Sequence, residues 1–103
     1  MQIELEVHEG DAKFSLGMIL VTAAIEKAIE EGKVEQEDVE TVIGRHVTGD
    51  WGEVCAEDAD MNSANLCNGD GVLFSVYTVG SFDIWVWTEP DRSATTVLFD
   101  YEW

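Results

Sequence analysis

The chain has 103 residues, 46% of them hydrophobic and ten aromatic, which is typical of one folded domain and argues against an acidic disordered tail. Its 22 acidic and five basic side chains give a net charge of −17, which argues against direct binding of nucleic acid, phosphorylated ligands or anionic membranes. The sequence has no run of about 18 apolar residues and no signal-peptide pattern, so we expect one acidic domain over residues 1–103, in the cytoplasm.

The first predicted element is a short amphipathic strand at residues 2–8, added at an edge of the sheet. Ile3, Leu5 and Val7 alternate there with polar side chains, a period of two that is typical of a half-buried strand. Residues 14–21 are mostly apolar, and this pattern fits a strand or a helix.

Three helices are predicted next, at residues 23–31, 35–47 and 57–67. Thr22 is expected to cap the first helix and Gly32 to end it. The second helix places four apolar side chains on one stripe: Val39, Val42, Ile43 and Val47. The second and third helices open with acidic residues, which favour the positive end of the helix dipole.

The last third of the chain predicts an antiparallel sheet. Residues 72–79 and 82–88 are rich in β-branched and aromatic side chains, and the Gly80-Ser81 pair between them suits a type II′ turn. That turn predicts a strand register, in which Val79 faces Phe82, Tyr77 faces Ile84, Val76 faces Trp85 and Phe74 faces Trp87. A third strand, residues 94–99, follows a turn at residues 89–93.

The predicted fold class is α+β, an antiparallel three- to four-stranded sheet with about three helices packed on one face. Both faces of the predicted sheet carry large apolar groups, whereas a half-solvated sheet would alternate apolar with polar residues. The second face is therefore covered by something else or serves as a contact surface.

Several polar and aromatic residues between and after the helices are expected to have structural roles. Asp50 and Glu53 predict a capping box for a short segment that begins at Trp51, whose ring would fill the junction of helix and sheet. His46 is placed near a helix C-terminus, where its cationic form is favoured. Arg92 is expected to pair with Glu89 or Asp91 and to hold the turn.

Catalytic and metal chemistry are the less favoured alternatives. A nucleophilic enzyme would use His46, Asp50, Cys55 and Arg92, but the spacing of Cys55 and His46 does not imply contact. We expect Cys55 and Cys67 to be buried thiols rather than a disulfide, although a pair remains open. The acidic clusters lack the ligand pattern of a calcium loop, so no cofactor and no metal is predicted.

Two stretches resemble a known family once they are taken together. Residues 45–58 read Arg-His-Val-Thr-Gly-Asp-Trp-Gly-Glu-Val-Cys-Ala-Glu-Asp, and residues 87–99 contain Thr-Glu-Pro-Asp-Arg-Ser-Ala-Thr-Thr. Both resemble motifs in a family of small bacterial proteins that are often encoded on plasmids and integrated elements, and the match covers most of residues 14–99. The resemblance implies a role against host defence, such as anti-CRISPR or anti-restriction activity.

The acidic residues suggest how such a role could work. Carboxylates three or four residues apart on a helix lie about 5–6 Å from each other, and duplex DNA carries one charge per ~1.7 Å of its axis. Acidic helices can therefore imitate a row of phosphates. The candidate partner-binding residues form three rows: Glu26, Glu30 and Glu31; Glu35, Glu37, Asp38 and Glu40; and Glu57, Asp58 and Asp60.

The leading hypothesis is a non-enzymatic DNA mimic that occupies the basic DNA-binding surface of a bacterial defence complex. Two alternatives stay open. One is a soluble acidic housekeeping protein adapted to a high-salt cytoplasm, where salt screens the self-repulsion. The other is an acidic adaptor for another basic protein.

Overall fold

The structure is a computed structural model that describes residues 12–102, and these form three helices, four strands and a short 3-10 turn. The helices are α1 (Ala23–Glu30), α2 (Gln36–Val47) and α3 (Ala56–Asn68). The strands are β1 (Met18–Val21), β2 (Leu73–Val79), β3 (Phe82–Thr88) and β4 (Ala94–Phe99), and the turn η1 covers Asp100–Glu102. The predicted strand at residues 2–8 lies outside the described residues.

The four strands form one sheet in the order β1-β4-β3-β2. β2, β3 and β4 are antiparallel neighbours, and the register between β2 and β3 confirms the prediction at all four pairs, from Val79 opposite Phe82 to Phe74 opposite Trp87. Gly80 has a φ of 60°, which the first central position of a type II′ turn requires. Local turn chemistry was therefore enough to set this register.

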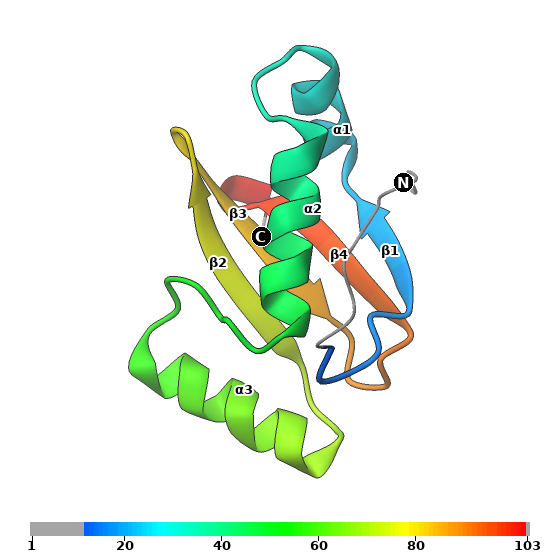
Figure 1. The fold of residues 1–103 in the computed structure, drawn as a ribbon, viewed down its shortest axis with the longest axis vertical. Helices are drawn as coiled ribbons and strands as arrows, with labels where there is room; N and C mark the ends of the chain where they lie inside the picture. Colours follow the sequence, from blue (N-terminus) through cyan, green and yellow to red (C-terminus); the bar gives the residue numbers. More distant parts are fainter. Residues whose placement is uncertain (1–11, 103) are drawn as a thin grey trace.

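The prediction of a purely antiparallel sheet is wrong, because β1 pairs parallel to β4. The ambiguous apolar stretch supplies this strand at Met18–Val21. Its partner, β4, lies more than 70 residues later in the sequence, so no local turn could reveal the pairing (Figure 1). The α+β class holds, with a mixed sheet.

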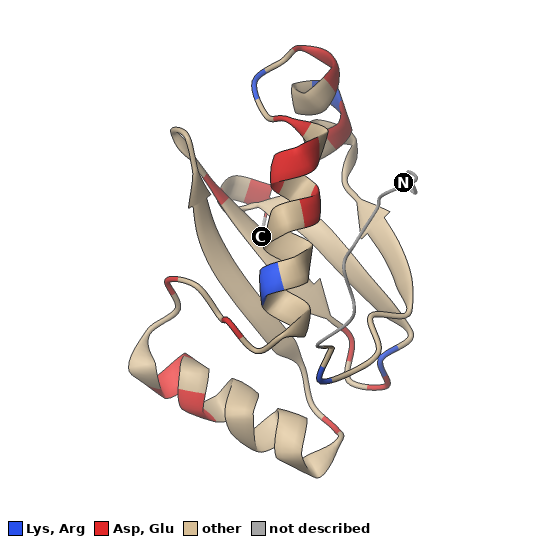
Figure 2. Ribbon diagram, in the orientation of Figure 1, with Lys and Arg blue, Asp and Glu red and all other residues tan. Residues whose placement is uncertain are grey.

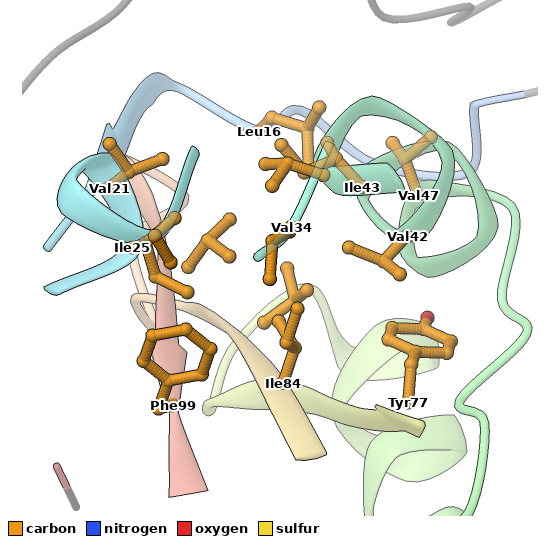
Figure 3. Packing of buried hydrophobic residues seen from close by; sticks show 14 residues of the cluster. Leu16, Val21, Ile25, Val34, Val42, Ile43, Val47, Tyr77, Ile84 and Phe99 are labelled. Atoms are coloured by element: carbon orange, nitrogen blue, oxygen red, sulfur yellow. The ribbon is translucent and has the colours of Figure 1, made fainter. Parts of the chain in front are cut away.

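All three helices contact the sheet: α1 contacts β4, α2 contacts β2 and β3, and α3 contacts β2. α2 crosses in front of the sheet and α1 lies at one end, while α3 contacts β2 (Figure 1). Figure 3 shows the resulting core, in which Ile25, Ile43 and Val47 from the helices meet Tyr77, Ile84 and Phe99 from the sheet. The predicted stripe on α2 is buried as expected.

The helix ends use the expected caps and one more. Thr22 caps α1 by accepting a hydrogen bond from the Ile25 amide at 3.3 Å, and the chain turns at Gly32 with a φ of 73°. At the start of α2, Glu35 and Asp38 form a reciprocal capping box, in which the Glu35 amide donates to the Asp38 carboxylate at 3.2 Å. Two of the candidate partner-binding acids thus hold the helix start.

The free edge of β2 is covered by polar groups. The side chain of Asn62, from α3, donates to the Phe74 carbonyl at 2.7 Å and accepts from the Phe74 amide at 3.1 Å. The segment at Trp51 runs beside Val76, whose amide donates to the Trp51 carbonyl at 3.2 Å. α3 is therefore attached through hydrogen bonds, and the edge cannot pair with another chain unless these bonds break.

The segment beginning at Trp51 is not the short capped segment that was predicted. Gly52 forms an isolated parallel bridge with Val76, and the Glu53 carboxylate accepts from the Thr78 hydroxyl instead of capping. Gly52 has a φ of 70°, and a Cβ there would lie 2.0 Å from the Val76 carbonyl oxygen. Only glycine allows the backbone this close to the strand. The tertiary contact with β2 overrides the local capping signal.

No helix among residues 12–102 is long and apolar enough to cross a membrane.

Candidate partner-binding surfaces

The two family-like motifs meet in the interior. His46, from α2, is 0% exposed, and its imidazole lies between Ser75 of β2 and Thr88 of β3. Its Nδ1 is 2.6 Å from the Ser75 hydroxyl and its Nε2 is 2.9 Å from the Thr88 hydroxyl. The Thr88 hydroxyl lies 2.8 Å from that of Thr95, which donates to the Leu16 carbonyl at 2.7 Å. We call this series the buried polar chain.

Counting protons fixes the direction of the buried polar chain. A carbonyl can only accept, so Thr95 donates to Leu16 and must accept from Thr88. The single proton of Thr88 is then used, so Thr88 accepts from Nε2–H of His46, and Nδ1 accepts from Ser75. Burial lowers the pKa of His46 to about 3, and the charge of Arg92 adds to the shift. His46 is neutral, so the expected cationic form is wrong.

Aromatic rings enclose the imidazole of His46. Phe14 contacts it edge-on with 5.3 Å between ring centroids, and Trp51 does so at 5.7 Å. Trp51 is 9% exposed, which agrees with the expected role of filling a junction. The neighbouring motif residues also have structural contacts: Arg45 donates to the Asp50 carboxylate at 2.7 Å, and its guanidinium lies 4.6 Å from the Tyr77 ring centroid. The hydrogen bond from Arg45 lowers the pKa of Asp50.

Arg92 holds the β3–β4 turn, but not through the expected carboxylates. Its guanidinium donates to the main-chain carbonyls of Gly71 at 2.6 Å, Pro90 at 3.1 Å and Asn65 at 3.2 Å. The residue has a φ of 61°, an uncommon conformation for a side-chain-bearing residue. Arg92 therefore joins the turn to the end of α3.

The residues of the enzyme alternative do not form a catalytic arrangement. Both ring nitrogens of His46 are bonded to hydroxyl groups inside the core, while Cys55 is exposed at the start of α3. Cys67 is also exposed, and both thiols are free, so the prediction of buried thiols is wrong. The reason is that α3 turns little of its surface toward the core and buries only Asn62. Within residues 12–102, no group of three or more His, Cys, Asp and Glu side chains could hold a metal ion.

The three acidic rows are divided between two places. Those of α1 and the first half of α2 gather at one end of the molecule, and that of α3 lies at the opposite end (Figure 2). We call the first group the α1–α2 acidic end; it comprises Glu26, Glu30, Glu31, Glu35, Glu37, Asp38 and Glu40. The second is the α3 acidic row; it comprises Glu57, Asp58 and Asp60. The molecule is 39 Å long, close to the ~34–36 Å of one turn of B-DNA.

The members of the α1–α2 acidic end differ in how they are held. Glu30 and Glu37 are exposed, whereas Glu35 and Asp38 form the capping box. Glu31 lies 3.4 Å from the Lys33 ammonium, an exposed ion pair. Glu26 is half-buried, and its Oε2 accepts no hydrogen bond from the described residues. Glu30 and Glu37 are both exposed and take part in none of the contacts described above, so both can be changed without removing one of them.

Three of the five basic residues make contacts with other residues of the same molecule. Arg92 binds main-chain carbonyls, Arg45 pairs with Asp50, and Lys33 pairs with Glu31. The α1–α2 acidic end keeps an excess of negative charge, because its seven acids face only Lys27 and Lys33 within residues 23–40 (Figure 2).

No family model, curated protein or solved structure matches this chain. The resemblance to plasmid and mobile-element proteins stays a prediction that rests on the two motifs.

Proposed function

We propose that this protein is a non-enzymatic inhibitor that imitates the charge of DNA and occupies the basic DNA-binding surface of a bacterial defence complex, of the CRISPR or restriction type. The observation that carries the proposal is the position of the acidic residues in the molecule. His46, Thr88 and Thr95 of the two motifs are buried, while the acids of three helices gather at two ends of a 39 Å molecule. The protein would act in the cytoplasm, where such complexes grip DNA.

The physical basis is electrostatic. A net charge of −17 steers the protein toward a Lys- and Arg-lined groove, and salt should weaken the complex. Phosphate-binding grooves bind rows of negative charge, and acids three and four residues apart on a helix form such a row. An acidic adaptor would share the salt dependence but would not compete with DNA.

The proposal is tested by letting the protein and target DNA compete for the same defence complex. Purified protein is immobilised and exposed to CRISPR effector and restriction complexes, and the retained complex is challenged with its own target duplex. Mimicry predicts release by moderate salt and displacement by that duplex. Retention that the duplex does not affect would contradict mimicry and favour the adaptor alternative.

Paired variants identify the docking end. Reversing Glu30 and Glu37 to Lys changes the α1–α2 acidic end without touching the capping box, and the matched variant reverses Glu57 and Asp60 in the α3 acidic row. All four residues are exposed. We expect one pair to weaken inhibition at least tenfold while the fold is retained. Equal, full inhibition by both variants would rule out both surfaces.

The melting temperature, measured over a series of KCl concentrations, distinguishes DNA mimicry from the high-salt alternative. A halophilic housekeeping protein should gain melting temperature steeply up to molar KCl, whereas a mimic should already be folded at low salt.

A further inference from the structure

A cavity of about 230 Å³ lies between α1 and one end of the sheet, and we call it the α1 cavity. One wall is formed by α1 and the loop that follows it, with the side chains of Ala24, Lys27, Ala28, Glu31 and Lys33. The other wall is aromatic, with Phe82 of β3, Phe99 of β4 and Tyr101 of η1. Sites for drug-sized ligands measure ~300–1,000 Å³, so the α1 cavity suits a ligand of about the size of one amino acid.

The three rings of the aromatic wall contact one another. The Phe99 ring is buried, and its centroid lies 5.2 Å from that of Phe82 and 5.2 Å from that of Tyr101. The planes of Phe99 and Tyr101 differ by 18°, which is a stacked arrangement. Contacts of this kind hold aromatic rings in place. Tyr101 is therefore fixed by packing although it is 69% exposed.

Hydrogen bonds tie the aromatic wall to α1. One carboxylate oxygen of Glu102, the residue next to Tyr101, accepts from the Thr22 hydroxyl at 2.8 Å and from the Phe99 amide at 2.8 Å. Thr22 is the residue that caps α1. The turn η1 is thus joined both to the helix and to the end of β4, so the two walls of the α1 cavity have a fixed separation.

The charges around the α1 cavity differ from those of the rest of the protein. Lys27 and Lys33 are two of only five basic residues in the chain, and both line the cavity. Glu31 lies 3.4 Å from the Lys33 ammonium, and the two side chains are 44% and 60% exposed. Ion pairs this exposed are weak, so Glu31 can take another cationic partner. These exposed groups are also within reach of a dissolved ligand.

This combination of groups favours a zwitterion that carries an aromatic ring. A carboxylate can accept charge-assisted hydrogen bonds from Lys27, and an ammonium group can donate to Glu31. A ligand with only a negative charge would be repelled by the net charge of −17, and one with only a positive charge would meet two lysines. A zwitterion has no net charge, so neither repulsion applies to it.

We infer that the α1 cavity binds a free aromatic α-amino acid. Its ring lies against Phe82 and Tyr101, its carboxylate accepts from Lys27, and its ammonium group donates to Glu31. The inference does not depend on DNA mimicry, because it concerns a small ligand and a separate set of contacts.

The test is isothermal titration calorimetry of the full chain at pH 7, with L-phenylalanine as the probe. Three reference compounds each lack one group: L-alanine lacks the ring, 3-phenylpropionate lacks the ammonium group, and phenethylamine lacks the carboxylate. We expect L-phenylalanine to bind about tenfold more tightly than each of them, because only it uses both charged groups and the ring. An affinity for 3-phenylpropionate or L-alanine equal to that for L-phenylalanine would overturn the inference.

Variants with one changed charge locate the ligand. Lys27→Gln should weaken the binding of L-phenylalanine about tenfold by removing the partner of its carboxylate. The matched control is Lys13→Gln, which removes the same charge beside the C-terminal end of α2, where the Lys13 amide donates to the Val47 carbonyl. The control should bind L-phenylalanine as the wild type does. Both lysines are exposed, so we expect both variants to fold.

Glu31→Gln should have opposite effects on two of the probes. It should weaken the binding of L-phenylalanine, whose ammonium group loses its partner, and strengthen that of 3-phenylpropionate, because a nearby negative charge is removed. Tyr101→Ser should weaken the binding of both probes, because both use the ring. Wild-type affinity for L-phenylalanine in Lys27→Gln and Tyr101→Ser, or no binding of L-phenylalanine to the wild type, would overturn the inference.

Discussion

The buried polar chain and the α1–α2 acidic end both include residues of α2, and they use its two ends in opposite ways. At the C-terminal end of α2, His46 is fully buried and has a hydroxyl partner at each ring nitrogen. At the N-terminal end, Glu35 and Glu37 are exposed to solvent. Within α2, the buried motif residue therefore serves the fold, and the exposed acids come from a stretch without a motif.

The difference follows from the energetics of burial. A buried polar group needs all of its hydrogen bonds, so His46 requires a hydroxyl group opposite each ring nitrogen, on β2 and on β3. An exposed carboxylate requires no particular neighbour, and one acid can replace another at little cost to stability. Residues that pack in the interior are therefore expected to form a sequence motif with fixed spacing. A surface that acts through its charge is expected to show in the sequence only as a high content of acidic residues.

The largest effect should come from removing the imidazole. His46→Leu leaves the hydroxyls of Ser75 and Thr88 buried without their partner, and we expect a loss of about 4 kcal/mol of unfolding free energy. Urea denaturation of the variant and the wild type measures this loss of unfolding free energy. The matched surface variant, Glu30→Lys with Glu37→Lys, should change stability by less than about 1 kcal/mol. A His46→Leu protein as stable as the wild type would show that the buried polar chain does not hold the fold.

The close approach at Gly52 should have the next largest effect. Gly52 and Gly69 both have a φ of 70°, but only at Gly52 would a Cβ meet another strand. Gly69→Ala should cost about 1 kcal/mol for its backbone conformation, and Gly52→Ala about 3 kcal/mol. Thermal denaturation of the two variants isolates the contact with Val76. Equal losses would mean that the segment at Trp51 can move away from β2.

The smallest effect is a dependence of stability on pH. The pKa of His46 is about 3 in the folded protein and 6.5 in an unfolded chain, so below pH 6.5 the unfolded state binds more protons at this site. Stability therefore falls as pH falls, by about 2 kcal/mol from pH 7 to pH 5. Urea titrations of the wild type and of His46→Gln should differ by this amount. Identical pH profiles would place a charged imidazole in the folded protein.

The sequence by itself determined the elements that depend on local chemistry. Thr22 and Gly32 bound α1, a stripe of apolar residues defines α2, and the Gly80-Ser81 turn sets the register of β2 and β3. Each of these signals acts between residues that are near each other in the chain, so the pattern contains the whole cause.

Only the tertiary structure decided the long-range relationships. β1 pairs with β4, His46 reaches Ser75 and Thr88, and Asn62 covers the edge of β2. It also divided the acidic residues between two ends of the molecule. The pairing of β1 with β4 and the hydrogen bonds of His46 and Asn62 join residues whose side chains carry no local sign of their partners. They form because burial requires each polar group to find a bond in the packed chain.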